Sequence, residues 1–149
     1  MQQQTKWLLI SCTIAFLTSC SNSLQKPITN DNNIAINGYS PVSYFEKNIA
    51  ELGQASHSYE YDEQVYYFAS EEQIDVFKKN PTKYLPRYGR YCPYSLAEGR
   101  RVAIDPTNFK IHDGQLLLFH NRVELNAIDP LTQENIFKKA DHQFKLLSF

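Results

Sequence analysis

The sequence predicts an α+β fold, a small single domain in which two β-hairpins pack with three or four short helices and a C-terminal helix. Strand-like segments come in two pairs, each joined by a turn signal, and helix signals lie between and after the pairs. The chain has 149 residues, which is enough for one domain with a hydrophobic core after a leader and a tether. Because the strand-like segments come in pairs joined by turns, a parallel α/β sheet is not expected.

The N-terminal segment is interpreted as an export signal that is not part of the fold. Residues 7–17 form an apolar run too short for a bilayer crossing, which takes about 20 residues. The run ends in Leu17-Thr18-Ser19-Cys20, and a small residue before a cysteine indicates a processing site. This ending resembles a bacterial lipobox, which implies a lipoprotein signal peptide over residues 1–19 and a lipid on Cys20. An ordinary secretory signal with an incidental cysteine is the alternative.

Residues 20–33 are expected to tether the folded part, residues 34–149, to a membrane. The segment is rich in Ser, Asn, Gln and Asp, so it buries too little apolar surface to fold. The lipobox resemblance implies the periplasmic side of a bacterial cell envelope. Ser21 after the cysteine implies the outer membrane, by the sorting rules of such lipoproteins. A formal net charge of −1 and scattered basic residues give no reason to expect a nucleic acid partner.

The first half of the domain carries two helix-start patterns on either side of a hairpin signal. Ser40 before Pro41 suits a capping residue followed by proline, and Ser70 with Gln73 three residues later forms a capping box. Strand-like segments flank Asp62-Glu63-Gln64. The elements expected here are a helix over 41–47, strands over 56–61 and 65–69, a helix over 71–79 and a helical turn over 81–85.

The second half carries one short helix, one hairpin and the closing helix. Pro93 starts the short helix and Gly99 lies just past its end, while the Asp-Gly pair at 113–114 is a strong hairpin signal. The elements expected here are a helix over 93–98, strands over 109–111 and 115–119, and an amphipathic helix over 131–147. The inward side chains expected on the last helix are Ile136, Phe137, Ala140 and Phe144.

Several spaced motifs resemble the YHS domain family. The chain reads VYYFAS over residues 65–70, Phe77, and NPTKYL over 80–85. These resemble the family's strand ending in Tyr-x-Phe-Cys-Ser, its helix with a Cys and then a Phe, and its Pro-x-x-Tyr-Leu close. The longer pattern, GYSPVSYF over 38–45 and GRYC over 89–92, resembles a subgroup of exported YHS proteins. That likeness extends to about residue 120, so residues 34–149 are interpreted as a YHS-like domain.

The chain departs from the family at its metal site. Metal-binding members resemble a three-cysteine site, and the matching positions here read Ser43, Ala69 and Gln73. A hydroxyl, a methyl and an amide cannot replace thiolates around a soft ion. The exported subgroup offers Cys92 instead, and some relatives carry selenocysteine at the matching position. The resemblance therefore implies that the sulfur of Cys92 serves reactivity or metal binding.

The number of cysteines in the chain also draws attention to Cys92. Of three cysteines, Cys12 leaves with the leader and Cys20 takes the lipid, so no disulfide can form within the folded part. Cys92 directly precedes Pro93 and is expected to cap the short helix, where unpaired backbone N–H groups would lower the thiol pKa. Arg90 could add to that effect. The alternative is a buried, inert cysteine.

Four further side chains are candidates for a site around Cys92. His57 and His120 are strand residues, and either imidazole together with a thiolate would suit copper or zinc. Tyr44 and Tyr91 could build an aromatic pocket beside the sulfur. The alternatives are structural histidines and tyrosines that pack their rings in the core.

The sequence thus predicts a lipid-anchored periplasmic YHS-like domain without turnover of its own. It would bind a transition metal, copper(I) or zinc, or another small ligand at a pocket containing Cys92. One alternative is a thiol redox protein in which Cys92 works with an external partner thiol. Another is a structural scaffold that docks an envelope protein. Sequence motifs of hydrolases, phosphate loops and nucleotide-binding folds are missing from the chain.

Overall fold

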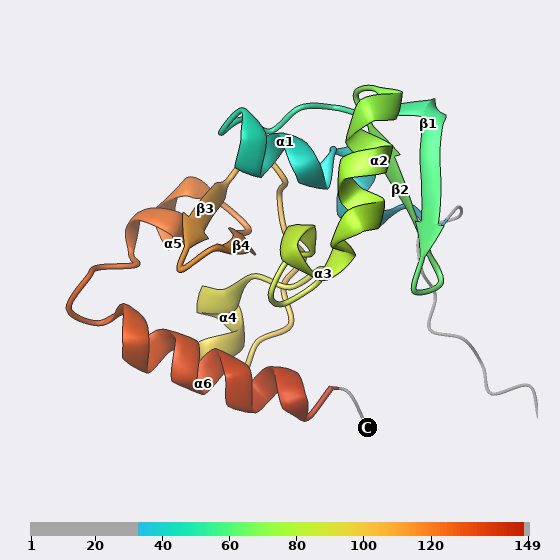
Figure 1. Ribbon diagram of the computed structural model, residues 1–149. Coiled ribbons are helices and arrows are strands. Elements are labelled where there is room, and N and C mark those ends of the chain that lie inside the picture. The colour runs from blue at the N-terminus through green and yellow to red at the C-terminus, as the bar shows by residue number, and fades with distance from the viewer. Residues whose placement is uncertain (1–32, 148–149) are drawn as a thin grey trace, which may run out of the picture.

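The computed structural model describes residues 33–147 and confirms the α+β fold with two antiparallel hairpins (Figure 1). Its elements in chain order are the 3-10 helix η1 (Ala35–Gly38), α1 (Pro41–Glu46), β1 (Gln54–Tyr61), β2 (Gln64–Phe68), α2 (Glu71–Lys79), α3 (Pro81–Tyr84), α4 (Pro93–Ala97), β3 (Phe109–His112), β4 (Gln115–Leu118), α5 (Arg122–Asn126) and α6 (Gln133–Lys145). Among the helices of residues 33–147, none has the length and apolarity that a membrane crossing needs. The expected leader, the lipid site at Cys20 and all but the end of the tether lie outside the described residues.

Most expected elements are confirmed within one or two residues, and two short helices, η1 and α5, were not expected. The last helix begins at Gln133 instead of residue 131. Asp129 is the reason, because its side-chain oxygen accepts the backbone N–H of Leu131 at 2.7 Å and its carbonyl accepts that of Gln133 at 2.8 Å. This Asx turn holds the chain in a tight loop until the helix starts.

The expected capping box at α2 is wrong in its details. Ser70 makes no side-chain cap, and Gln73 Oε1 accepts the backbone N–H of Ala69 at 3.0 Å. Gln73 is buried, and its amide joins separate elements of the fold and does not cap α2.

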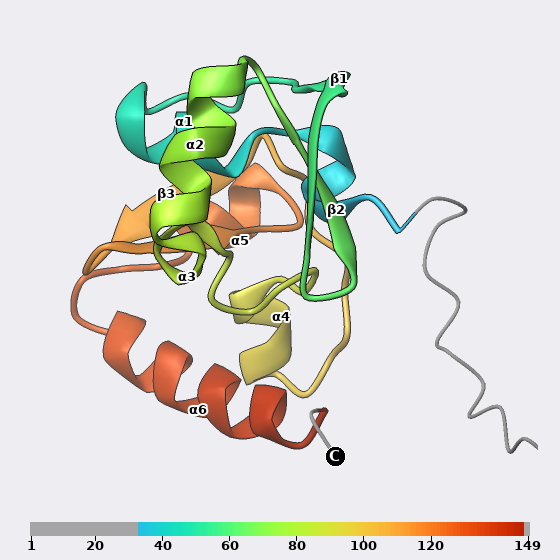
Figure 2. The ribbon, with the colours of Figure 1, turned by 45° about the vertical axis from the view of Figure 1, so that its right-hand side comes forward.

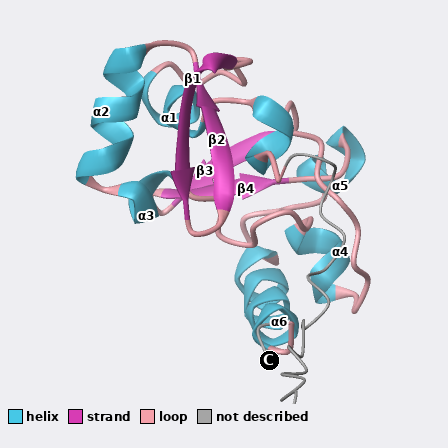
Figure 3. Ribbon diagram, turned by 90° about the vertical axis from the view of Figure 1, so that its right-hand side faces the viewer, coloured by secondary structure: helices cyan, strands magenta, loops and turns pink. Residues whose placement is uncertain are grey.

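Two-residue turns close both hairpins. Tyr61 pairs with Gln64, and His112 pairs with Gln115. Asp62 and Glu63 both have positive φ, as a hairpin turn with the strands' own twist requires. Figure 3 shows the first hairpin crossing the second at a steep angle.

Strand β4 is buried on both of its faces, and this divides the core. Leu116 and Leu118 pack with Tyr44 and Ile104 on one face. Leu117 and the following Phe119 pack on the other face, in a cluster with Cys92, Phe137 and Ala140. Figure 2 shows the second hairpin between α1 above and α4 and α6 below. A third cluster, centred on Phe77, joins the first hairpin to α2 and α3.

The chain enters the domain through a strained segment. Ile36 and Asn37 both have φ of 50° and are followed by Gly38 at 84°. The left-handed region costs a residue with a Cβ roughly 1–2 kcal/mol. Hydrogen bonds from Tyr39 to the Ile36 carbonyl (3.0 Å) and from Gly53 to the Gly38 carbonyl (2.8 Å) hold the segment in place.

Candidate functional site

Cys92 stands at the N-terminus of α4, as expected. Its backbone is extended, Pro93 follows as the first helical residue, and its N–H donates to the Val102 carbonyl at 3.0 Å. The side chain is fully buried in the cluster that β4, α4 and α6 share. The backbone therefore fixes the position of the sulfur, and the sulfur is buried from solvent.

The sulfur faces a carboxylate that the sequence analysis did not single out. Cys92 Sγ donates a hydrogen bond to Glu124 Oε2 at 2.8 Å. Ser95 Oγ donates to both carboxylate oxygens, at 3.0 and 3.1 Å, and Arg100 Nη2 lies 3.4 Å from Oε1. We refer to Cys92, Ser95, Arg100 and Glu124 as the thiol–carboxylate cluster. It holds one acid, one cation and two neutral donors.

The cluster is layered from the core to the surface. Cys92 and Ser95 are fully buried, the side chain of Glu124 is 12% exposed, and that of Arg100 is 51% exposed. Arg100 also binds Glu98 at 2.6 Å, so its guanidinium bridges two carboxylates. The thiol thus lies behind Glu124, and Glu124 lies behind Arg100.

The expectation of a lowered thiol pKa is wrong. Burial is the largest influence and raises the pKa of Cys92, and the hydrogen bond and charge of Glu124 raise it further. Backbone N–H groups of Ser95 and His120 point at the sulfur and lower the pKa, but they only partly offset the rise. Arg90 is not among the groups that shift the Cys92 pKa, and the cation of this cluster is Arg100. At rest the group is a neutral thiol.

Glu124 is held as a carboxylate. Burial alone would raise its pKa, but hydrogen bonds from Cys92, Ser95 and Arg100 bring the pKa of Glu124 below its usual range. The charge on Arg100 acts in the same direction. Glu124 therefore accepts the hydrogen bond of the Cys92 thiol as a carboxylate.

A local signal could have revealed the helix that carries Glu124. Asn121 is followed three residues later by a glutamate, which is a helix-start pattern. Asn121 Oδ1 accepts the backbone N–H of Glu124 at 2.8 Å and so caps α5. The pattern predicts the helix, but it does not indicate that Glu124 faces Cys92.

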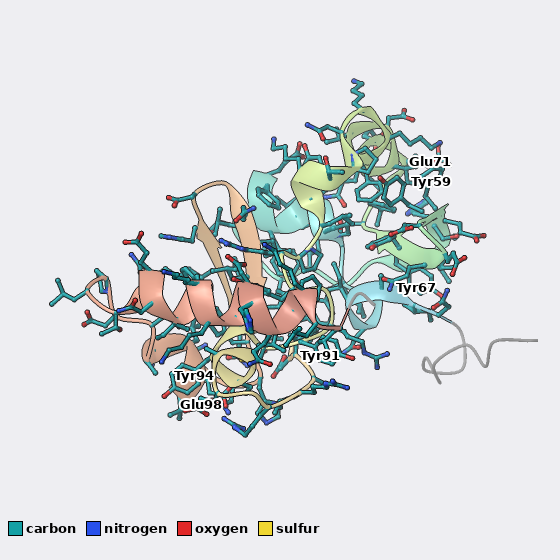
Figure 4. The ribbon with its side chains drawn as sticks, turned by 90° about the horizontal axis from the view of Figure 1, so that it is seen from below. Tyr59, Tyr67, Glu71, Tyr91, Tyr94 and Glu98 are labelled. Carbon is teal, nitrogen blue, oxygen red and sulfur yellow. The ribbon has the colours of Figure 1, made fainter. Side chains whose placement is uncertain are left out.

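The structure does not bring Tyr44 to Cys92. The Tyr44 hydroxyl donates to the Pro106 carbonyl at 2.9 Å, and its ring packs edge-on against Phe109. Tyr44 lies on the opposite face of β4 from Cys92, so the expected pocket built from both is wrong. Tyr91 does pack against the cluster that contains Cys92, partly buried beside α4 (Figure 4).

The two histidines do not complete a metal site with Cys92. His57 lies on β1, on the hairpin of Tyr59, which Figure 4 shows well apart from Tyr91. The His120 ring is exposed and its Nδ1 is bonded to the Ala103 carbonyl at 3.0 Å, so His120 reaches the sulfur only through its backbone N–H. Within residues 33–147 no three His, Cys, Asp or Glu side chains are grouped as a metal ion would require.

Ser43, Ala69 and Gln73, the three positions at which the resemblance would place cysteines, lie close together. Gln73 Nε2 donates to Ser43 Oγ at 2.9 Å, and Gln73 Oε1 accepts the backbone N–H of Ala69 at 3.0 Å and the Ser40 hydroxyl at 2.7 Å. Ser40, Ser43 and Gln73 are buried. The Gln73 amide therefore joins the N-terminal part of α1, the end of β2 and α2 by hydrogen bonds.

Open cavities lie elsewhere on the molecule. Cys92 lines none of three cavities of about 540, 430 and 580 Å³ that open on the described residues. The expected ligand pocket around the sulfur is thus not among them, because Glu124 and Ser95 fill the space that it needs. No family model, curated protein or solved structure matches this chain.

Proposed function

We propose that this chain is a YHS-like domain held by lipid on Cys20 at the periplasmic side of a bacterial outer membrane. The lipobox resemblance and the polar segment after it support the anchor. The meeting of Ser43, Ala69 and Gln73 at one buried point supports the family resemblance, because a shared metal site needs such convergence. Fractionation of the full chain and its Cys20→Ser variant tests the anchor: the variant should leave the membrane fraction.

We further propose that the domain acts through the Cys92 thiol, with Glu124 as its proton acceptor and an external thiol as its partner. The single observation that carries this proposal is the hydrogen bond from Cys92 Sγ to Glu124 Oε2 at 2.8 Å. The N–H groups of Ser95 and His120 add two donors for the negative sulfur once the proton has left. The cluster therefore keeps the thiol neutral at rest, and the two N–H groups partly offset the influences that disfavour its charged form.

The chemistry proposed is reduction of a peroxide. The sulfur attacks one oxygen of ROOH, the O–O bond breaks, and the thiol proton passes through Glu124 to the leaving oxygen, which gives Cys92–SOH and ROH. An external thiol then displaces water from sulfur and leaves a mixed disulfide. A second external thiol releases Cys92 as the thiol and carries away the partner disulfide. An external thiol is required because Cys92 is the one cysteine of the described residues.

Access to the sulfur is expected through Arg100. Its contact with Glu124, at 3.4 Å, is the longest in the cluster, and its side chain is half exposed. Because the contact is long and its cation is half exposed to solvent, it is the contact of the cluster that opens most readily. The buried thiol is thereby shielded from chance oxidation without being sealed.

The experiment compares two reagents on the full, reduced chain. Hydrogen peroxide oxidation, followed by trapping of the sulfenic acid with dimedone and intact mass measurement, needs a proton for the leaving oxygen. Iodoacetamide needs none, because iodide leaves as an anion. Glu124→Gln should slow the peroxide reaction at pH 7 at least tenfold, since positioned general acids and bases contribute about 10²–10⁴-fold. The same variant should not slow alkylation.

Glu98→Gln is the matched control, because Glu98 binds Arg100 but does not touch the sulfur. It should react with peroxide at close to the wild-type rate, and Cys92→Ser should give no adduct. A Glu124→Gln variant that reacts with peroxide faster than the wild type would overturn the proposal, since Glu124 would then only suppress the thiolate.

Binding of copper(I) or zinc is the second candidate function. It is favoured by the facing sulfur and oxygen donors of Cys92 and Glu124, which a cation could bridge after displacing the thiol proton. Titration of copper(I) into the reduced chain should then show about one equivalent, lost in Cys92→Ser and weakened in Glu124→Gln. The single thiolate ligand makes this the weaker candidate.

A further inference from the structure

A cavity of about 540 Å³ lies beside the first hairpin, apart from the thiol–carboxylate cluster. Its wall is built by η1, β2, the segment before α4 and the chain around Ile104. Ala35, Tyr66 and Ile104 line it although they are 6%, 5% and 9% exposed, so the cavity reaches the core. Its volume lies in the range of about 300–1,000 Å³ that is typical of small-molecule sites.

One arginine of the cavity wall forms no ion pair within the described residues. Arg87 and Arg90 both line it. The Arg87 guanidinium is neutralised by Asp141, whose two oxygens it binds at 2.7 and 3.0 Å. Arg90 forms no side-chain hydrogen bond and no ion pair with residues of the described chain, and Asp62 is the single acidic residue of the lining.

A buried hydroxyl adds a neutral donor. Burial, with the negative charge of Asp62 as a smaller influence, raises the pKa of Tyr66 to about 12, so its hydroxyl keeps the proton at neutral pH. The hydroxyl reaches Gln64 Oε1 only at 3.4 Å, close to the limit of a hydrogen bond. It can therefore turn to a better acceptor inside the cavity.

The strained entry segment forms another part of the wall. Ile36 and Asn37, both with left-handed backbones, line the cavity. A branched residue such as Ile36 rarely adopts this backbone, and strain of this kind concentrates at sites where a side chain must be aimed. Here it turns an apolar and an amide side chain toward the same space.

The geometry points to a binding site for a small organic anion with an apolar body, such as an aromatic or aliphatic carboxylate. Arg90 binds the anionic group, Tyr66 and Asn37 supply hydrogen bonds, and the side chains of Ala35, Ile36 and Ile104 hold the apolar body. This site does not rest on the thiol chemistry, because Cys92 does not line the cavity.

A matched pair of fluorescent probes tests both the cavity and its charge. 8-Anilinonaphthalene-1-sulfonate carries an anion on an apolar body, and N-phenyl-1-naphthylamine is the same body without the anion. Each probe is titrated into the full chain and into its variants. Arg90→Gln should weaken binding of the sulfonate about tenfold and leave the affinity for the neutral probe unchanged. Arg101→Gln is the control, because Arg101 is an exposed arginine outside the cavity.

A second variant tests whether the probes bind in this cavity. Gln64 is exposed on β2 at the cavity wall, so Gln64→Trp should fill the space without disturbing the core. It should reduce binding of both probes at least tenfold, with unchanged circular dichroism. Wild-type affinity for the sulfonate in Arg90→Gln would overturn the charge assignment. Wild-type affinity for both probes in Gln64→Trp would overturn the site, as would failure of the wild-type chain to bind either probe.

Discussion

Asn121 and Glu124 are joined by a hydrogen bond from the backbone N–H of the glutamate to the asparagine side chain, at 2.8 Å. This cap starts α5 and at the same time sets the direction of the Glu124 carboxylate, which lies over Cys92 and Ser95. Asn121 therefore helps to position the carboxylate to which the Cys92 thiol donates its hydrogen bond.

Asn121→Ala should destabilise the protein and loosen the thiol–carboxylate cluster. Loss of an N-cap costs about 0.5–2 kcal/mol, and α5 is only one turn long, so its other bonds cannot hold it. Urea unfolding followed by circular dichroism measures the first effect, and the alkylation rate of Cys92 measures the second. Asn126→Ala, at the exposed far end of α5, should change neither. Equal values for the two variants would show that the cap does not order Glu124.

Glu124→Gln should lower the pKa of the Cys92 thiol. In the wild type, burial raises that pKa and the hydrogen bond and charge of the carboxylate raise it further, so removal of the charge takes away part of the rise. The thiol remains neutral well above neutral pH in both proteins, but the variant ionises earlier as the pH increases. The rate of alkylation by iodoacetamide between pH 7 and pH 10 gives both pKa values. A higher pKa in the variant would mean that Glu124 does not face the sulfur as a carboxylate.

The elements that sequence reasoning predicted are those with signals inside one turn of chain. Proline after the capping residues Ser40 and Cys92 marks the start of α1 and α4, and the Asp-Gly pair at 113–114 marks the second hairpin. Each of these signals depends on residues that are close in sequence, so it does not depend on how distant segments pack. The Asn121 cap of α5 belongs to the same class of local signal.

The site itself depends on packing between distant segments. Glu124 meets Cys92 because α5 packs over α4, and no spacing rule links residues 32 positions apart. The separation of Tyr44 from Cys92 follows from β4, which lies between them. Its unbroken apolar run, Leu116-Leu117-Leu118, is typical of a strand buried on both faces and does warn that the two residues could be divided.

Tyr44→Phe should reduce stability without changing the thiol. The hydroxyl bonds the Pro106 carbonyl at 2.9 Å in a buried setting, and a buried carbonyl left without its donor costs about 1–3 kcal/mol. Because β4 stands between Tyr44 and Cys92, the pH profile of alkylation should match the wild type. Tyr94→Phe is the matched control, since the Tyr94 hydroxyl makes no hydrogen bond within residues 33–147, and it should alter stability by less than about 0.5 kcal/mol. A changed thiol profile in Tyr44→Phe would restore the pocket that the sequence suggested.

Three cysteines placed at Ser43, Ala69 and Gln73 should create a soft-metal site. The Gln73 amide now bonds the Ser43 hydroxyl at 2.9 Å and the backbone N–H of Ala69 at 3.0 Å, so cysteines at the three positions should lie close enough to share one metal ion. Three thiolates suit zinc, cobalt or copper(I). Cobalt(II) titration should show about one equivalent and a thiolate-to-metal absorption band. The triple variant is made in a Cys92→Ser background so that no other thiol of residues 33–147 contributes. A double variant that keeps Ala69 should bind more weakly, because it lacks one ligand. A triple variant that folds but binds no metal would contradict the YHS resemblance at these three positions. The resemblance implies that their side chains converge on one site.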